Sequence, residues 1–174
     1  MPTIFKPSEM EFKRDKFNSD RFNLLTILPN LCKQVNSKHL VFDVRCIGPG
    51  SYSFPYHYHR NAEELMMIIS GSMAIRTMKG FQILQQGEIV FMEMGESGAH
   101  QFYNHTGASC SYLDVKSFKG LDIVEYPDSG KVLISPFGEV FDKNGQVEYL
   151  KGEEDSKDAW KDFKLSSSNG ATPL

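Results

Sequence analysis

The stretch PYHYHRNAEELMMIISG, residues 55–71, places two histidines one residue apart and follows them with two glutamates. Neighbouring side chains of a β-strand point to opposite faces, so His57 and His59 are expected to share one face of a strand. The short turn that follows brings either Glu63 or Glu64 back to that face, and strand alternation allows only one of the two. The sequence therefore predicts a cluster of two imidazoles and one carboxylate.

A second segment, residues 87–106, supplies a further histidine, His100, after a loop that contains glycine. Three neutral imidazoles and one carboxylate form a borderline-hard ligand set that suits divalent Fe, Mn, Ni, Co or Zn. A single histidine is more often a surface or hydrogen-bonding residue, but spaced histidines, a following carboxylate and a later histidine together favour a ligand set. The sequence therefore predicts one divalent transition metal with open positions for water or substrate.

The rest of the chain has the pattern of an all-β protein. In residues 40–47, Leu, Phe, Val and Cys alternate with Val41, Asp43 and Arg45, which is typical of a half-buried strand. Short apolar runs then follow at close intervals as far as residue 118, separated by turns that contain glycine. This spacing favours an antiparallel sandwich or barrel over strands that alternate with helices.

One domain accounts for the 174 residues. Residues 1–39 are expected to form an extended arm with an edge strand near residues 22–28, and residues 40–150 to form the barrel. Residues 151–174 are expected to form a short polar helix, over 151–163, and a loose tail. Because an uncovered sheet edge favours pairing with a second chain, the arm is a candidate for exchange between the subunits of a homodimer.

Composition and charge narrow the expected partners and location. The formal net charge is −3 and the basic residues are scattered, so nucleic acid is not an expected partner. No apolar run is long enough to span a bilayer, and the N-terminal residues lack the apolar core of a secretory signal, so no membrane is expected either. The three cysteines share no CxxC spacing, which favours reduced thiols in the cytoplasm.

The segment from Gly50 to Gly71 resembles the first motif of the cupin superfamily: a glycine, two histidines one residue apart, three or four residues, a glutamate, six residues and a glycine. Counting six residues back from Gly71 selects Glu64. The segment that begins at residue 87 is similar to the second motif, in which a glycine, a hydrophobic strand and a turn precede a histidine and, four residues later, an asparagine. Its members here are Gly87, Gly95, His100 and Asn104.

This resemblance implies a double-stranded β-helix, or jelly-roll barrel, with a metal in its mouth. The ligands carried over from the motifs are His57, His59, Glu64 and His100. The stretches HQFYNHT and EYPDSGKV are also similar to those of small single-domain bacterial cupins of unassigned chemistry. Cupins include dioxygenases, isomerases, decarboxylases and metabolite-binding proteins, so the fold does not select a reaction.

Two departures from the second motif lie close together. Glu93 stands where the family usually has a proline, and the turn before His100, GESGA, is two residues longer. The longer turn affects the direction in which the side chain of His100 points. Glu93 adds a carboxylate near the barrel mouth, and if burial raises its pKa it is a candidate catalytic general base.

Two functions fit these features. A divalent metal with open positions polarises a carbonyl or hydroxyl oxygen, which predicts a metal-dependent enzyme of dioxygenase, isomerase or lyase type that acts on a small molecule. The alternative is a non-catalytic cupin that binds a sugar or another metabolite, which the small size and the lack of an appended domain favour.

Overall fold

The structure is a computed structural model that describes residues 2–14, 19–153 and 160–162. The chain divides into two units, residues 1–143 and 144–174. The described strands all belong to the first unit and confirm the predicted all-β class. They are β1 (Phe12–Arg14), β2 (Leu24–Ile27), β3 (Leu40–Ile47), β4 (Tyr58–His59), β5 (Glu64–Ser70), β6 (Ser72–Thr77), β7 (Gly80–Gln85), β8 (Ile89–Met92), β9 (His100–Tyr103), β10 (Cys110–Ser117), β11 (Asp122–Tyr126), β12 (Lys131–Ser135) and β13 (Glu139–Asp142).

Helical segments are short in the described part of the chain. There is one α-helix, α1 (Leu31–Gln34), and there are single turns at Pro7–Glu9, Glu96–Gly98 and Lys143–Gly145. Of the predicted helix over 151–163, residues 154–159 and 163 lie outside the described ranges, and residues 151–153 and 160–162 form no α-helix. No helix of the described residues is long and apolar enough to cross a membrane.

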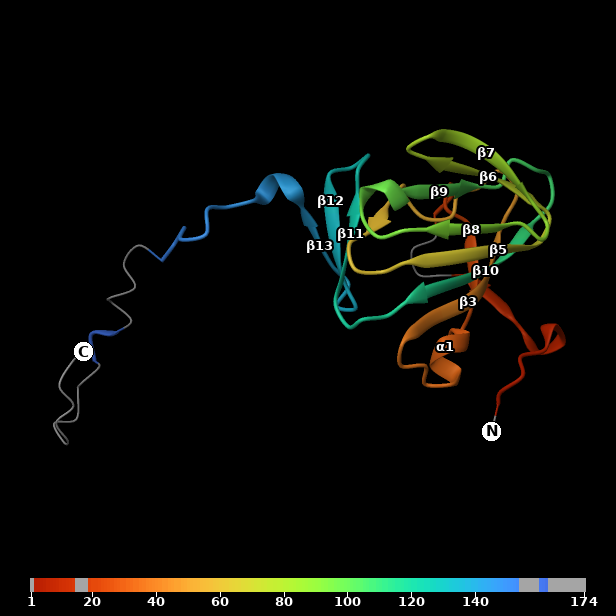
Figure 1. Ribbon diagram of the computed structural model, residues 1–174, viewed down its shortest axis with the longest axis horizontal. Helices are drawn as coiled ribbons and strands as arrows, with labels where there is room; N and C mark the ends of the chain where they lie inside the picture. The colour runs from red at the N-terminus through yellow and green to blue at the C-terminus, as the bar shows by residue number, and fades with distance from the viewer. Residues whose placement is uncertain (1, 15–18, 154–159, 163–174) are drawn as a thin grey trace. The chain divides into compact units, whose positions relative to one another are not determined.

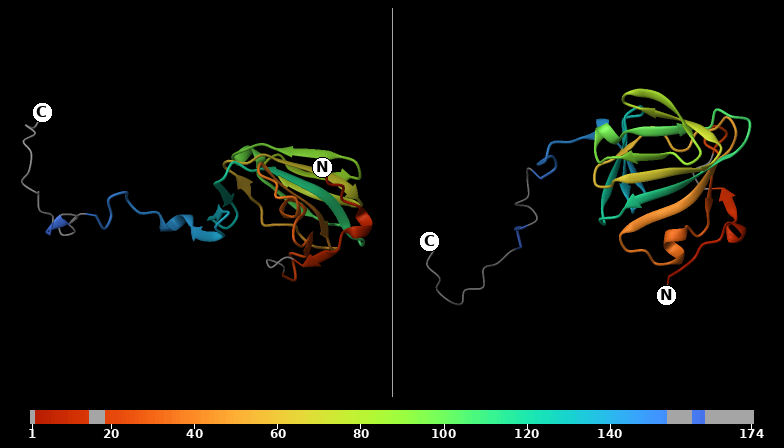
Figure 2. Two further views of the ribbon diagram at one scale, coloured as in Figure 1. Left: turned by 90° about the horizontal axis from the view of Figure 1, so that it is seen from below. Right: turned by 45° about the vertical axis from the view of Figure 1, so that its right-hand side comes forward.

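Two layers of antiparallel strands face each other in the first unit (Figures 1 and 2). One layer is a six-stranded sheet with the order β1-β2-β3-β10-β5-β8. The opposite layer contains the sheets β7-β6-β9 and β13-β12-β11-β4. An isolated bridge between His57 and His100 lies where these two smaller sheets meet, because it joins β9 to the residue that precedes β4.

The interior between the layers changes from apolar to polar along the strands. At one end the inward-facing side chains of β3, β5 and β10 are apolar: Ile47, Met66, Ile68, Cys110 and Tyr112. Burial of each large apolar side chain contributes about 1.5–3 kcal/mol to stability. Toward the other end the same inward rows carry Arg45, Glu64, Asp114 and Lys116. This polar end holds the candidate site.

The N-terminal segment is anchored to one edge of the large sheet. The strand expected near residues 22–28 is observed as β2, which pairs with β3 of the same chain. Asp43 on β3 accepts hydrogen bonds from the backbone N of Ile27 (3.2 Å) and Leu31 (3.3 Å) and from Nδ2 of Asn30 (2.8 Å). This buried carboxylate therefore joins β2 and the start of α1 to β3.

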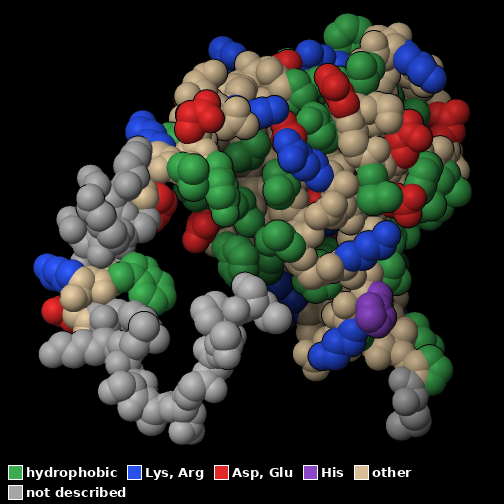
Figure 3. Space-filling model, turned by 60° about the vertical axis from the view of Figure 1, so that its left-hand side comes forward, with side chains coloured by type: hydrophobic (Ala, Val, Ile, Leu, Met, Phe, Trp, Pro, Cys, Tyr) green, Lys and Arg blue, Asp and Glu red, His purple; other side chains and the backbone are tan. Residues whose placement is uncertain are grey.

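Charged groups are mixed on the surface seen in Figure 3, where Lys and Arg side chains lie among acidic and hydrophobic ones rather than in a patch of one sign. This distribution agrees with the scattered basic residues of the sequence. The surface in this view therefore offers no basic stripe for a nucleic-acid backbone.

Candidate metal centre

Strand pairing brings together two histidines that are 43 positions apart in the numbering, His57 and His100. The backbone N of His57 donates to the carbonyl of His100 over 3.1 Å, and the backbone N of His100 donates in return over 2.9 Å. The two imidazole centroids are consequently 4.6 Å apart. His59 follows on β4, Glu64 opens β5 and His100 opens β9, so three strands and the bridge residue His57 converge on one point inside the barrel.

The Nδ1 atom of each imidazole forms a hydrogen bond with a group that lies outside the cluster. Nδ1 of His57 lies 2.8 Å from the carbonyl of Pro55, and Nδ1 of His100 lies 3.0 Å from the carbonyl of Gly98. Because a carbonyl oxygen only accepts, both Nδ1 atoms must carry the hydrogen when these rings are neutral, which leaves each Nε2 with a free lone pair. Nδ1 of His59 is bonded to the carboxylate of Asp122. Metal-binding histidines are commonly oriented by partners of this kind.

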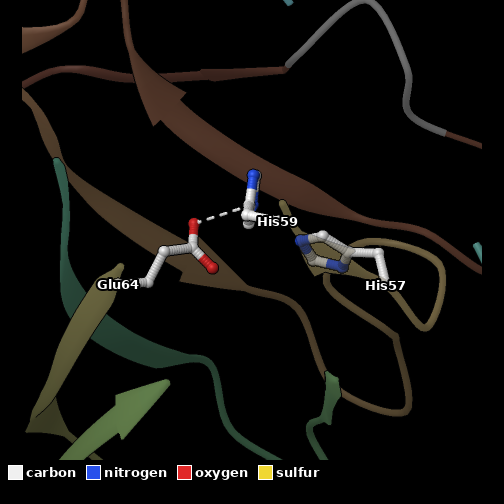
Figure 4. Close-up of side chains that lie close together, drawn as sticks. All are labelled: His57, His59 and Glu64. Atoms are coloured by element: carbon white, nitrogen blue, oxygen red, sulfur yellow. Dashed lines mark ion pairs between the residues drawn. The ribbon is translucent and has the colours of Figure 1, made fainter. Parts of the chain in front are cut away.

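The carboxylate of Glu64 lies between the inward-facing nitrogens. Its Oε1 is 3.3 Å from Nε2 of His59, and its Oε2 is 3.3 Å from Nε2 of His100. Ligand atoms of His57, His59 and Glu64 lie within 4.8 Å of one another (Figure 4). His100 stands outside that group of three but adjoins it through Glu64.

The four residues fit a metal ion. Within the described residues, Glu64 Oε2 and His100 Nε2 are buried without a hydrogen-bond partner, although they are in contact. When the His100 ring is neutral, with its hydrogen on Nδ1, both atoms are acceptors, and buried acceptors that face one another are unfavourable without a cation. Nitrogen and carboxylate ligands together suit a divalent transition metal.

At His57 and Glu64, electrostatics favour the protonation states that metal ligands need. Burial, together with the neighbouring His100, lowers the pKa of His57 to about 3, so this ring is neutral. Burial opposes the charge on Glu64, but the contact with His59 and the nearby histidines lower its pKa below the usual value. Burial also disfavours the charged form of His59, yet Asp122 and Glu64 raise its pKa. A metal ion would displace the proton that His59 carries between these carboxylates.

The structure distinguishes the predicted carboxylates. Glu64 is buried, whereas Glu63 is exposed and its backbone N bonds to the hydroxyl of Ser117 over 3.0 Å. Glu93 is also exposed, on the loop after β8, and it is not among the residues that line the pocket beside the histidines. The structure therefore brings together His57, His59, Glu64 and His100, and it does not bring Glu93 to them.

The longer turn before His100 is a compact loop. A Cβ atom on Gly98 would lie 1.9 Å from the carbonyl oxygen of Glu93, so only glycine fits at this position. The close approach places the carbonyl of Gly98 where Nδ1 of His100 reaches it. The departure from the usual motif thus supplies the group that orients His100.

A pocket of about 150 Å³ opens beside the histidines, and several of its charged residues were missed by the sequence interpretation. On β10, Asp114 and Lys116 line it together with Arg45 from β3. Nε of Arg45 donates to Oδ2 of Asp114 over 2.6 Å. Strand alternation along β10 places Asp114 and Lys116 on the same face of the sheet, and this pattern in the sequence could have indicated that the two side chains lie together. No local pattern marks Asp122 as the partner of His59.

Comparison with known proteins identifies the fold. Residues 44–116 match the family model described as cupin domain. No curated protein sequence matches the chain.

Three solved structures are similar. A sugar phosphate isomerase of a cupin superfamily from Silicibacter pomeroyi has 18% identity and a TM-score of 0.72, over 86% of this chain and 98% of its own. A candidate sugar phosphate isomerase from Acidithiobacillus ferrooxidans has 21% identity and a TM-score of 0.70, and the match covers 83% of this chain and 95% of that one. A polyketide cyclase from Streptomyces resistomycificus has 18% identity and a TM-score of 0.55, and the match covers 67% of this chain and 80% of that one. At these identities the similarity establishes the fold, so the predicted jelly roll is confirmed.

Proposed function

We propose, on the premise that residues 44–116 are a cupin domain, that the protein is a metal-dependent enzyme that moves a proton on a small molecule bound in the barrel mouth. The observation that carries the proposal is the pair of buried, unpartnered atoms that face one another, Nε2 of His100 and Oε2 of Glu64, with His57 and His59 beside them. A cation between them would relieve their repulsion. His59 completes the proposed set of ligands.

The expected cofactor is one divalent ion of Fe, Mn, Ni, Co or Zn. When bound, such an ion polarises a carbonyl or hydroxyl oxygen of the substrate. Asp122 and the carbonyls of Pro55 and Gly98 hold the imidazoles in place, so these side chains do not have to reorganise when the site is used.

Asp114 is the group that we assign to proton transfer. Arg45 donates to its Oδ2, whereas its Oδ1 is buried without a hydrogen-bond partner among the described residues. Burial raises the pKa of Asp114 in spite of the nearby Arg45, which moves the carboxyl toward the range of a general base at neutral pH. Lys116 lines the same pocket and offers an ammonium group to a substrate oxygen. Asp114 is preferred to Glu93 because Glu93 is exposed.

Two of the similar structures support a proton-transfer reaction of isomerase type, since they are described as a sugar phosphate isomerase and a candidate for one. Isomerisation of a sugar moves a proton between neighbouring carbons. A non-catalytic binding protein remains the alternative, and the experiment below separates the two functions.

Proton exchange in D₂O tests the proposal and does not require the product to be identified. Metal-loaded protein is incubated with separate pools of sugar phosphates, 2-hydroxy acids and 2-oxo acids, and loss of C–H signals is followed by NMR. We expect exchange in one pool that Asp114→Asn abolishes while metal content stays unchanged. The exposed Asp128→Asn is the matched control, because Asp128 pairs with Arg76 away from the site. Ligand binding without exchange in any pool would favour the non-catalytic alternative.

We also propose that the protein is a homodimer that associates through the outer face of the large sheet. Two rows of register partners cross this face on β3, β10, β5 and β8, and none of their side chains is charged. The first row consists of Phe42, Val115, Leu65 and Phe91. The second row consists of Val44, Leu113, Met67 and Ile89. A solvated sheet face normally carries polar side chains at such positions. An uncharged face can meet its own copy across a two-fold axis without repulsion between like charges.

A cytoplasmic location is part of the same proposal. The three cysteines, Cys32, Cys46 and Cys110, are free thiols. Thiols in a small β-protein without disulfides suit a reducing compartment.

A further inference from the structure

A second cavity, about 310 Å³ in volume, adjoins the site pocket. The two cavities share three lining residues, Phe54, Tyr126 and Leu133. The ring centroids of Phe54 and Tyr126 each lie 6.0 Å from that of His57, so the shared wall begins beside a proposed metal ligand. We call this second cavity the side chamber. Its other lining residues are Phe22, Leu24, Ser53, Pro55, Lys131, Gly138 and Val140.

The side chamber and the site pocket differ in chemistry. The site pocket contains Arg45, Asp114 and Lys116 in addition to the proposed metal ligands. Among the described residues that line the side chamber, Lys131 alone is charged, and its Nζ lies 5.2 Å from the ring centroid of Tyr126. The hydroxyl of Ser53 already accepts a hydrogen bond from the backbone N of Phe102. The chamber therefore offers few groups that could satisfy a hydroxylated ligand.

We infer that the substrate has an oxygen-bearing end that enters the site pocket and an apolar body that fills the side chamber. The inference rests on the proposed function and names its substrate class, such as a 2-oxo or 2-hydroxy acid with an alkyl or aryl substituent. Most hydroxyl groups of a sugar would find no replacement in the side chamber for their hydrogen bonds to water, at a cost of roughly 1–3 kcal/mol for each bond left unmade. The apolar walls thus select against a body that is hydroxylated along its length.

The sizes of the two cavities agree with this division. An apolar cavity of about 150 Å³ can hold one benzene molecule. The side chamber, at about 310 Å³, has room for a ring or a chain of several carbons. The site pocket, at about 150 Å³, holds a head group of a few atoms.

Chain-length dependence of binding tests the inference. Zinc-loaded protein is titrated calorimetrically with 2-oxobutanoate and with 2-oxooctanoate, which have the same head and differ by four methylene groups. Each methylene that becomes fully buried strengthens binding about fourfold, so we expect the longer acid to bind at least about 20-fold more tightly. Equal affinities, or no binding of the longer acid, would overturn the inference. The zinc content of the same sample separately reports whether the proposed metal site exists.

Two variants on neighbouring positions of β13 locate the effect. Val140 lines the side chamber and pairs with Leu133, whereas Phe141 pairs with Val132 and points to the other side of the hairpin. Both side chains are exposed enough to accept a charge, at 57% and 49%. Val140→Asp should weaken binding of 2-oxooctanoate about tenfold and leave that of 2-oxobutanoate unchanged, and Phe141→Asp should change neither. An equal effect of both variants would contradict the placement of the apolar body.

Discussion

Nε2 of His100 lies 3.3 Å from Oε2 of Glu64, and neither atom has a hydrogen-bond partner within the described residues. Nδ1 of His100 must be the protonated nitrogen of the neutral ring, because it faces the carbonyl of Gly98. In this neutral form the short distance joins two acceptors rather than a donor and an acceptor. Buried groups arranged in this way are prepared to share a cation.

Glu64→Gln should remove the ligand charge while keeping the shape of the side chain. We expect metal affinity to fall at least about tenfold, because a neutral amide replaces an ionised ligand. Metal retained after dialysis, measured by elemental mass spectrometry, reports the change. Glu63→Gln is the matched control, since Glu63 is the exposed neighbour. Equal retention of metal in the two variants would remove Glu64 from the ligand set.

Asp122→Asn should weaken metal binding although Asp122 is not a proposed ligand. The carboxylate bonds to Nδ1 of His59 and also accepts from the backbone N of Asn61 over 3.1 Å. Loss of such an orienting group commonly costs about 10–100-fold in metal affinity. The measurement is a competitive titration with a chelating indicator, with the exposed Asp128→Asn as control. Unchanged affinity would show that β4 alone orients His59.

Gly98→Ala should disturb the proposed metal site, because Gly98 lies on the loop that precedes His100. The added methyl group would meet the Glu93 carbonyl at 1.9 Å, so the backbone must move and carry the acceptor of His100 with it. We expect about 1–3 kcal/mol of destabilisation together with weaker metal binding. Chemical denaturation and metal titration measure the two effects. Gly107→Ala, where a Cβ would meet nothing within 4 Å, should be nearly neutral.

Metal-free protein should lose stability as the pH falls below about 6.5. Burial lowers the pKa of His57 from 6.5 to about 3, so between these values the unfolded chain binds a proton that the folded chain does not. The free energy of unfolding then falls with decreasing pH, by at most about 1.4 kcal/mol per pH unit for this one group. The raised pKa of His59 has the opposite sign, but it acts above pH 6.5, where the folded chain holds a proton that the unfolded chain does not.

Comparison of variants isolates the contribution of His57. Denaturation midpoints of the metal-free protein are measured from pH 8 to pH 5. The decline toward low pH should be smaller in His57→Gln than in the wild type, whereas the exposed His105→Gln should follow the wild type. The same decline in all three proteins would assign the acid sensitivity to other groups.

Phe91→Glu should separate the proposed dimer. Phe91 is 58% exposed at one end of an uncharged row, where a charge would be desolvated against the partner. We expect sedimentation velocity to shift from dimer to monomer while metal content is kept. Phe137→Glu, at a position that is 69% exposed on the β12–β13 turn, is the control. A wild-type monomer would contradict the proposed interface.

The fold and the core of the site were accessible from sequence because they rest on local patterns. The one-residue spacing of His57 and His59 requires a strand to bring them to one face, and the distance to Gly71 selects Glu64 over Glu63. The first feature depends on the period of two of a strand, whereas the choice of Glu64 depends on the resemblance to the cupin motif. In the structure His57, His59 and Glu64 are buried close together, and Glu63 is exposed.

The remaining features depend on pairing between distant strands. Asp122 meets His59 because β11 pairs with β4, which no local pattern encodes. Alternation placed Asp114 and Lys116 on one face of β10 but did not say that this face was the interior. Glu93 is exposed because its loop is packed through its backbone against Gly98, a detail of chain path that composition does not reveal.

Titration of metal-free protein with Zn²⁺ by calorimetry, beside a His57→Ala/His100→Ala double variant, tests the proposed metal centre most directly. The expected result is one ion bound per chain with release of a proton, and loss of this tight binding in the double variant. Absence of binding by the wild type, or equal binding by the double variant, would contradict a metal site built from these histidines and Glu64.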